Sequence, residues 1–241
     1  MTARAEFMER IRREVQKTGG LFPARAADRP PDPAGAAGVV RRRLAERWPA
    51  AIARFREEFE RLAGVFHVVP AMDAVPAVVG RIARERGIQR LIAWSPAALG
   101  ADLTEGLRGE GIEAVATPDG RAGTAEAQRL REIHAAAGIG LTGADLAIAE
   151  TGTLVLQSGR GRPRSTSLLP EYHIAVFDRR ALVETLEQAG VILEAWHADP
   201  AREASGGAIT FITGPSRTAD IELTLTRGVH GPREVHAIFI Q

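Results

Sequence analysis

Short apolar segments alternate with stretches of helical periodicity along most of the chain beyond residue 64. Three of these segments are short enough and apolar enough to form strands: Val65–Val69, Arg90–Trp94 and Glu113–Ala116. A chain that repeats strand and helix in this way builds a mostly parallel sheet with helices on both faces. Further strands are expected at His173–Phe177, Ala208–Ile212 and Val235–Phe239, and helices at residues 73–87, 101–107, 125–137 and 182–190.

The stretch Asp145–Ser158 predicts a hairpin within this pattern. Two short apolar runs, residues 146–149 and 154–156, are joined by Glu150–Thr153. Runs of this length indicate buried strands, and Gly152 supplies the positive φ that a tight turn requires. The sequence therefore predicts an α/β protein with a parallel-rich mixed sheet and a hairpin near residues 145–158.

The first part of the chain predicts helices and a linker. Residues 3–17 place apolar side chains on one helical face, whereas residues 18–38 are rich in Pro, Gly and Ala. A long helical pattern covers residues 39–62, with a bend expected near Trp48-Pro49. We expect a helix and linker over residues 1–38 and a single α/β domain over residues 39–241.

Composition excludes several classes of protein. The 241-residue chain has a net charge of +1, which argues against extensive binding of nucleic acid. It has no cysteine and can therefore form no disulfide, thiolate zinc site or cysteine-ligated iron–sulfur cluster. No signal peptide and no apolar run of membrane-spanning length is present, so we expect a cytoplasmic protein. The histidines show no metal-binding spacing, and no dinucleotide or phosphate-loop motif occurs.

Glu150 is the unusual residue of the hairpin. A carboxylate at the end of a buried strand must meet water or hydrogen-bond donors, because an unpaired buried charge is very costly. Thr151, Gly152 and Thr153 follow it in the same turn. Glu150 is therefore either a solvated strand-end acid or a functional carboxylate in a cleft.

A second candidate segment runs from Gly214 through Pro215 and Ser216 to Asp220. Ser216 is placed to cap a helical turn, and backbone N–H groups beside Arg217 and Thr218 suit a carboxylate or phosphate. The following Ile221, Leu223 and Leu225 alternate with polar residues, which favours a strand instead. A short helix is our preferred interpretation.

Two further segments contain polar candidates. In the glycine- and arginine-rich segment 158–167, residues 159–163 are typical of a solvated basic loop, whereas Arg164 and Ser165 adjoin apolar residues and are better placed for a fixed role. His230, in a tight Gly- and Pro-flanked loop, is a candidate general acid or base, since histidine titrates near neutrality. A structural role in hydrogen bonding is an equal alternative for His230.

Several of these motifs resemble those of the LUD-domain family. The residues that carry the resemblance are Ala149–Thr153, Ser167–Pro170 with His173-Ile174, Gly214–Glu222 and Gly228–Pro232. The resemblance implies the three-layer α/β/α fold of the NagB/ribose-5-phosphate isomerase/CoA-transferase group. It also implies a role in oxidising L-lactate to pyruvate together with lactate utilization A- and B-type subunits, which hold the iron–sulfur clusters while this chain binds no cofactor.

The resemblance leaves the chemical step of this chain open. One hypothesis is a subunit that binds a small carboxylate or a partner in a cleft between Glu150 and Arg217. A second is a stand-alone acyl- or CoA-transferase with Glu150 as nucleophile, by analogy with CoA-transferases of similar fold. The third is a non-catalytic scaffold or sensor that binds its ligand without turnover.

Overall fold

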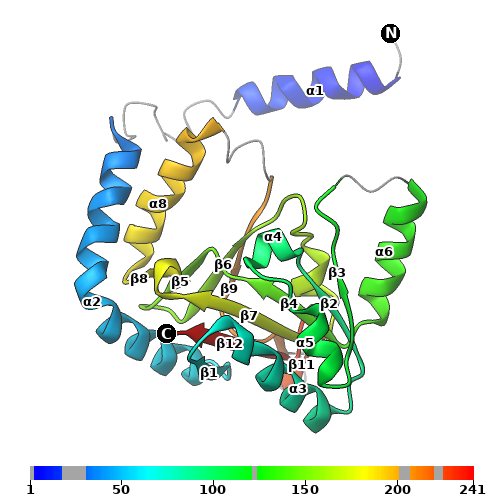
Figure 1. The fold of residues 1–241 in the computed structure, drawn as a ribbon. Helices are drawn as coiled ribbons and strands as arrows, with labels where there is room; N and C mark the ends of the chain where they lie inside the picture. Colours follow the sequence, from blue (N-terminus) through cyan, green and yellow to red (C-terminus); the bar gives the residue numbers. More distant parts are fainter. Residues whose placement is uncertain (1–2, 18–30, 121–123, 201–206, 220–224) are drawn as a thin grey trace.

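The computed structural model describes residues 3–17, 31–120, 124–200, 207–219 and 225–241. Six parallel strands form the main sheet, and their carboxyl ends therefore lie along one edge. Figure 1 shows this sheet in the middle of the molecule. In spatial order its strands are β1 (Val65–Val69), β12 (Glu234–Ile240), β7 (Tyr172–Asp178), β4 (Ile139–Gly143), β2 (Arg90–Ala93) and β3 (Glu113–Ala116).

One face of the main sheet is covered by α3 (Val75–Arg86) and α5 (Thr104–Gly109). Val75 and Val79 of α3 are fully buried against strand residues such as Leu141 and Ile174. The helix ends at Gly87, whose φ of 66° is the left-handed conformation that glycine adopts at low cost. The helix expected over residues 73–87 is thus confirmed, with a short 3-10 turn, η2 (Met72–Ala74), at its start.

The predicted hairpin is confirmed, but it belongs to a second sheet. This sheet has the order β8 (Leu182–Val183), β5 (Leu146–Ile148), β6 (Thr153–Gln157) and β9 (Ile209–Ile212). Ala147 and Leu154 pack toward the main sheet, whereas Ile148 and Val155 pack toward α8 (Leu186–Ala198). Because both faces of the hairpin are buried, its strands are continuous apolar runs rather than alternating ones.

The long helix α2 (Pro33–Arg61) lies beside α8 and shares the core on this side of the main sheet (Figure 1). Asp32 caps its start by accepting a hydrogen bond from the backbone N–H of Gly35 at 2.8 Å. The segment that the sequence assigns to a linker is therefore helical from Pro33 onward. Pro49 lies inside α2, and the helix changes direction along its length as expected for a proline kink.

Other elements also differ from expectation. Leu182 and Val183 form a strand rather than the start of a helix, and α8 continues through Gly190 to Ala198. The strand β4 was not expected, because Ile139–Gly143 contains two glycines and no apolar run. The remaining elements are α1 (Ala3–Lys17), α4 (Pro96–Leu99), α6 (Thr124–Ala136), α7 (Ser165–Leu168), η3 (Arg179–Ala181), β10 (Arg217–Ala219) and β11 (Leu225–Arg227).

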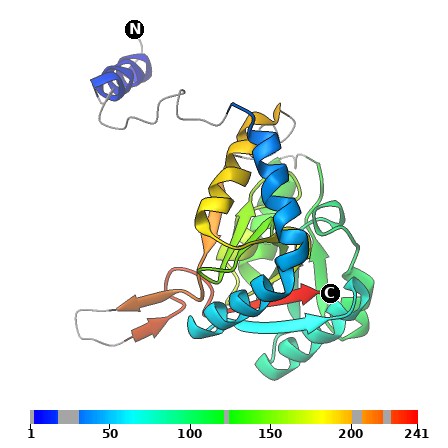
Figure 2. The same cartoon turned by 90° about the vertical axis from the view of Figure 1, so that its left-hand side faces the viewer.

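The strands β10 and β11 pair antiparallel and extend away from the two sheets (Figure 2, orange to red). The helix α1 is present as predicted, and its Phe7, Met8 and Ile11 are exposed. Within the described ranges, no helix combines the length and the apolar character needed to cross a membrane.

Candidate functional site

A hollow of about 260 Å³ opens at the carboxyl edge of the main sheet. Its walls come from the ends of β4, β7 and β12 and from α4, η2 and η3. Ligands of open α/β sheets bind beyond this edge. Among the described residues, the charged side chains that line it are those of Asp145, Asp178 and Arg180.

Asp145 is held firmly in this wall. Its side chain is 6% exposed, and Oδ1 accepts a hydrogen bond from Arg162 Nη1 at 2.8 Å. Oδ2 accepts from the backbone N–H of Gln157, also at 2.8 Å. The Arg162 guanidinium in turn lies over the ring of Trp94, 5.3 Å from its centroid. Asp145 is therefore a paired, buried carboxylate.

The interpretation of residues 159–163 as a solvated loop is wrong for Gly161 and Arg162. Gly161 is buried, and its carbonyl accepts a hydrogen bond from the backbone N–H of Ser95 at 2.9 Å. A Cβ added at Gly161 would lie 2.2 Å from Ser95 Oγ, so the loop fits closely against the start of α4. Within this loop Arg160 is exposed, as expected. The composition of the loop alone did not reveal that Arg162 pairs with the buried carboxylate of Asp145.

A larger hollow, of about 480 Å³, lies between α2 and η3 and shares Arg180 with the first. Arg180 is fixed by Asp178, whose Oδ2 lies 2.6 Å from Arg180 Nη2 and 2.8 Å from Nε. Hydrogen bonding and the charge of Asp178 raise the pKa of Arg180 above its usual value. The described residues that line this hollow are Arg41, Leu44, Ala45, Trp48, Arg179 and Arg180.

The predicted turn Glu150–Thr153 lies against the end of α2. Gly152 has a φ of 58°, and an added Cβ would lie 2.4 Å from the backbone nitrogen of Phe59. Thr151 Oγ1 donates a hydrogen bond to Thr153 Oγ1 at 2.7 Å, and Thr153 Oγ1 lies 2.8 Å from Thr213 Oγ1. The turn is therefore fixed on two sides.

The carboxylate of Glu150 lies at the first turn of α8. Oε2 accepts a hydrogen bond from the backbone N–H of Leu186 at 2.9 Å, and Glu150 is exposed. The start of a helix has unpaired N–H groups and a partial positive charge, which favour an acid there.

The helix expected after Ser216 is wrong, because residues Arg217–Ala219 form the strand β10. The alternation of Ile221, Leu223 and Leu225 in the sequence was the better signal, although residues 220–224 lie outside the described part of the chain. Ser216 instead joins the loop before β12. Its backbone N–H donates to Pro232 O at 2.8 Å, and Ser216 Oγ accepts from the backbone N–H of His230 at 3.3 Å.

The other candidates of this segment occupy varied positions. Gly214 has a φ of 84°, and an added Cβ would lie 2.8 Å from Leu62 O. Arg217 Nη2 donates to the same carbonyl at 3.1 Å. Pro215 is buried, and Thr218 lies opposite Thr226 in the β10–β11 pair. Asp220 lies outside the described residues.

The structure brings the two predicted turns together at the end of α2. The charged side chains, however, have different partners: Glu150 bonds to Leu186, and Arg217 bonds to Leu62. Neither is among the described residues that line the two hollows. A shared Glu150/Arg217 cleft stays a prediction.

Arg164, Ser165 and His230 lie elsewhere. Arg164 precedes α7 and is exposed, and its carbonyl accepts a hydrogen bond from Ser167 Oγ at 3.1 Å. Ser165 begins α7, where its carbonyl accepts from the backbone N–H of Leu169. His230 is exposed beside Ser216.

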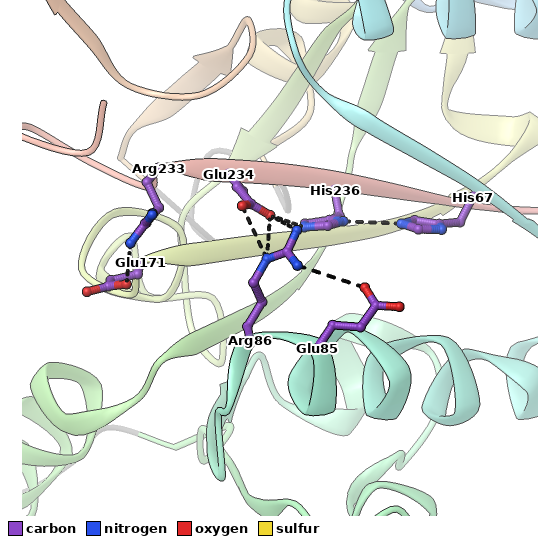
Figure 3. A network of polar contacts seen from close by, with 7 residues as sticks. All are labelled: His67, Glu85, Arg86, Glu171, Arg233, Glu234 and His236. Carbon is purple, nitrogen blue, oxygen red and sulfur yellow. Dashed lines mark hydrogen bonds and ion pairs between the residues drawn. The ribbon is translucent and has the colours of Figure 1, made fainter. Parts of the chain in front are cut away.

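A polar network that the sequence analysis did not identify lies between α3 and the main sheet (Figure 3). His67 of β1 and His236 of β12 stack with centroids 5.4 Å apart, and His67 Nε2 lies 3.2 Å from His236 Nδ1. Glu234 Oε2 lies 3.3 Å from His236 Nε2 and accepts from Arg86 Nη2 at 3.0 Å. One tautomer suits this order: His67 Nε2–H donates to His236 Nδ1, so that His236 Nε2–H faces the carboxylate.

Burial favours the neutral form of both histidines. Burial, followed by the charge of Arg81, lowers the pKa of His67. Burial is also the main reason that the pKa of His236 falls to about 4, although the Glu234 carboxylate opposes it. On the opposite face of the sheet, burial lowers the pKa of His173 to about 3, and its Nε2 lies 2.9 Å from Thr142 Oγ1.

The hollow at the carboxyl edge had a partial signal in the sequence. Asp178 directly follows the predicted strand His173–Phe177, which is where ligand-binding residues of α/β sheets occur. Asp145 follows β4 in the same way, but β4 was not predicted because its sequence contains two glycines and no apolar run. Arg41 and Trp48 gave no signal, because their spacing on a helix is equally typical of packing.

Comparisons with known proteins agree with this fold. The LUD domain profile matches residues 52–240. Lactate utilization protein C of Halalkalibacterium halodurans is 38% identical over 162 residues, which is 67% of this chain and 66% of that protein. The protein of the same name from an Exiguobacterium species is 41% identical over 110 residues, covering 46% of this chain and 47% of that protein. The matched segments thus span less than two thirds of these relatives.

A solved structure also matches. The crystal structure of a DUF162 family protein from Deinococcus radiodurans superimposes with a TM-score of 0.50 at 22% sequence identity. The match covers 80% of this chain and 98% of that one. At this identity the similarity establishes the α/β fold alone.

Proposed function

Because this chain belongs to the LUD domain family, we propose that it is a component of an L-lactate utilization system. The observation that carries the proposal is the 38% identity to Lactate utilization protein C over 67% of the chain. In this proposal the chain acts with A- and B-type subunits that oxidise L-lactate to pyruvate.

The electrons in this scheme leave through the partner subunits. Oxidation of one L-lactate to pyruvate releases two electrons and two protons, and the electrons pass to iron–sulfur clusters of the A- and B-type subunits. This chain has no cysteine to ligate such a cluster, so the clusters belong to its partners. Its own part is to bind the small carboxylate or to dock the subunits that carry the clusters.

We propose that the small carboxylate ligand binds where the Glu150–Thr153 turn and the turn before Arg217 meet. Thr153 and Thr213 lie 2.8 Å apart there, beside Glu150 on one turn and Arg217 on the other. Arg217 holds the substrate carboxylate, for which a guanidinium fork is suited. Glu150 accepts the hydroxyl proton, while the C2 hydrogen leaves as a second proton and its two electrons pass to the clusters of the partner subunits. Both residues must exchange their present partners, Leu62 and Leu186, for the ligand.

Reconstitution with purified partners tests the proposal. Lactate oxidation by the A- and B-type subunits is measured with and without this chain, and the rate is expected to fall when the chain is omitted. An unchanged rate would refute its membership of the working assembly.

Calorimetry tests the site separately. L-lactate and pyruvate are titrated into the wild-type chain, Arg217→Ala and the control Arg160→Ala, whose arginine is exposed in another loop. Weaker binding to Arg217→Ala alone is expected. Equal binding by all three proteins excludes Arg217 from the site.

Incubation with acyl-CoA followed by mass spectrometry tests the alternative transferase activity, which requires a covalent adduct on Glu150.

A further inference from the structure

We propose that the hollow between α2 and η3 binds an organic anion that carries a flat ring. The acid group of the ligand lies between the guanidinium groups of Arg179 and Arg180, and the ring lies on Trp48. This site is separate from the Glu150/Arg217 region, and the inference does not rest on the proposed function.

One face of α2 forms the first wall. Arg41, Leu44, Ala45 and Trp48 have the spacing i, i+3, i+4 and i+7, which places them on one side of a helix. Leu44 is buried and joins this face to the core. Trp48 is partly exposed, and its ring packs on Phe239 with centroids 6.0 Å apart. The core thus fixes an aromatic ring that still borders the hollow.

One arginine of the opposite wall is held in place as well. Arg180 is fixed by three contacts with Asp178, two from its guanidinium and one from its backbone N–H. Arg41 reaches from α2 to η3 and β8, where Nη1 donates to the carbonyls of Arg180 and Leu182. Arg179, beside them, is exposed. A ligand would therefore meet cations whose ordering cost is already met in part by the fold.

The charge of this hollow favours an anion. Three of the described lining residues are arginines and none of them is acidic. The Arg180 guanidinium is paired with Asp178 but keeps further N–H groups, and Arg179 adds a second cation next to it, so that an acid can bond to both. Arginine forks hold carboxylates and phosphates through paired hydrogen bonds. Carboxylate and phosphate are therefore the two candidate acid groups.

The size of the hollow indicates a ligand larger than a three-carbon acid. Its volume of about 480 Å³ falls within the range of sites for drug-sized molecules. Arg180 also lines the hollow at the carboxyl edge of the sheet, where α/β proteins bind their ligands. A ring on Trp48 and an acid at Arg179 and Arg180 fill the space that lactate would leave open.

Binding to the full chain tests the proposal by calorimetry. Two probes carry both a ring and an acid: adenosine 5′-monophosphate and 2-naphthoate, which distinguish phosphate from carboxylate. Adenosine supplies a ring without the acid, and inorganic phosphate an acid without the ring. We expect at least one of the two acids to bind at least tenfold more tightly than both adenosine and phosphate. If neither acid does so, the proposal is overturned.

Variants then locate the bound probe. Arg179→Gln changes an exposed residue and is expected to weaken binding at least fivefold, whereas Arg160→Gln, a matched exposed arginine outside the hollow, leaves it unchanged. Trp48→Phe is expected to remove most of the ligand-induced change in tryptophan fluorescence, since the remaining Trp94 and Trp196 lie outside the hollow. Equal affinity of wild type and Arg179→Gln, or an undiminished fluorescence change in Trp48→Phe, would overturn the proposed site.

Discussion

The carboxylate of Glu150 accepts a hydrogen bond from the backbone N–H of Leu186, 36 residues further along the chain. The contact joins the hairpin turn to the first turn of α8, where N–H groups lack partners within the helix. Glu150 therefore stabilises the fold in the absence of any ligand. A loss of activity on its replacement has two possible causes, which must be separated.

Replacing Glu150 by Ala and by Gln separates them. Glu150→Ala removes the acceptor for Leu186 and is expected to lower the free energy of unfolding by about 1 kcal/mol, as for other helix-capping side chains. Glu150→Gln retains a carbonyl acceptor and should lose less. Urea unfolding measures both. If Glu150 also accepts a proton from the substrate, Glu150→Gln will fold normally yet fail in the reconstituted lactate assay; equal stability of wild type and Glu150→Ala would contradict the capping role.

The pairing of Asp145 with Arg162 makes a second prediction. Arg162→Ala leaves a carboxylate that is 6% exposed without its guanidinium partner. Removing one partner of a buried ion pair costs about 3–5 kcal/mol, and we expect the lower end because the Arg162 side chain is 29% exposed. Arg160→Ala, in the same loop but exposed, should change stability by no more than about 0.5 kcal/mol. Thermal unfolding compares the two variants, and equal stability would contradict the role of Arg162 as the partner of Asp145.

Two glycines of β4 give a matched pair for packing. A Cβ at Gly140 would lie 1.7 Å from the carbonyl oxygen of Thr166, whereas a Cβ at Gly143 would be 3.7 Å or more from its nearest neighbours. Gly140→Ala must therefore displace backbone, and we expect it to destabilise the chain by about 3 kcal/mol or to prevent folding, at or beyond the upper end of overpacked cores. Gly143→Ala should fold with near-normal stability. Expression and urea unfolding decide between them, and normal folding of Gly140→Ala would show that α7 does not press on β4.

The alternation of strand and helix was predictable because it depends on local periodicity. Val75, Val79 and Ile82 recur at helical spacing, and the structure buries all of them on α3. The hairpin was predictable for the same reason, since Gly152 separates two short apolar runs. That this hairpin forms a second sheet with β8 and β9 was not, because strand pairing between distant segments leaves no local pattern.

The site was harder to predict, because its residues acquire their roles through partners distant in sequence. The position of Asp145 depends on Arg162 and on the backbone of Gln157. That of Arg41 depends on the carbonyls of Arg180 and Leu182, more than 100 residues away. The direction in which Glu150 and Arg217 point depends on Leu186 and Leu62, which carry no chemical signal of their own. His67 and His236 look like ordinary strand residues until β1 and β12 are paired.

The buried histidines predict that acid destabilises the chain. In the unfolded chain each histidine titrates near 6.5, whereas burial lowers the pKa of His236 to about 4 and that of His173 to about 3 in the folded state. Below pH 6.5 the unfolded state therefore binds more protons than the folded state, and the free energy of unfolding falls as the pH falls. The full contribution is present above pH 6.5 and is lost progressively toward pH 4 for His236.

His236→Gln tests this dependence. Urea unfolding between pH 4 and 7.5 gives the slope of stability against pH, to which one proton contributes about 1.4 kcal/mol per pH unit. The variant is expected to show a slope shallower than wild type by about one proton below pH 6.5, because it removes a group that only the unfolded chain protonates there. It also removes the partner of His67, whose charged neighbours Arg81 and Glu85 remain. His197→Gln, at an exposed position, should leave the slope unchanged. Parallel slopes for wild type and His236→Gln would mean that His236 is protonated in the folded chain, and the tautomer assigned to the stacked pair would then be wrong.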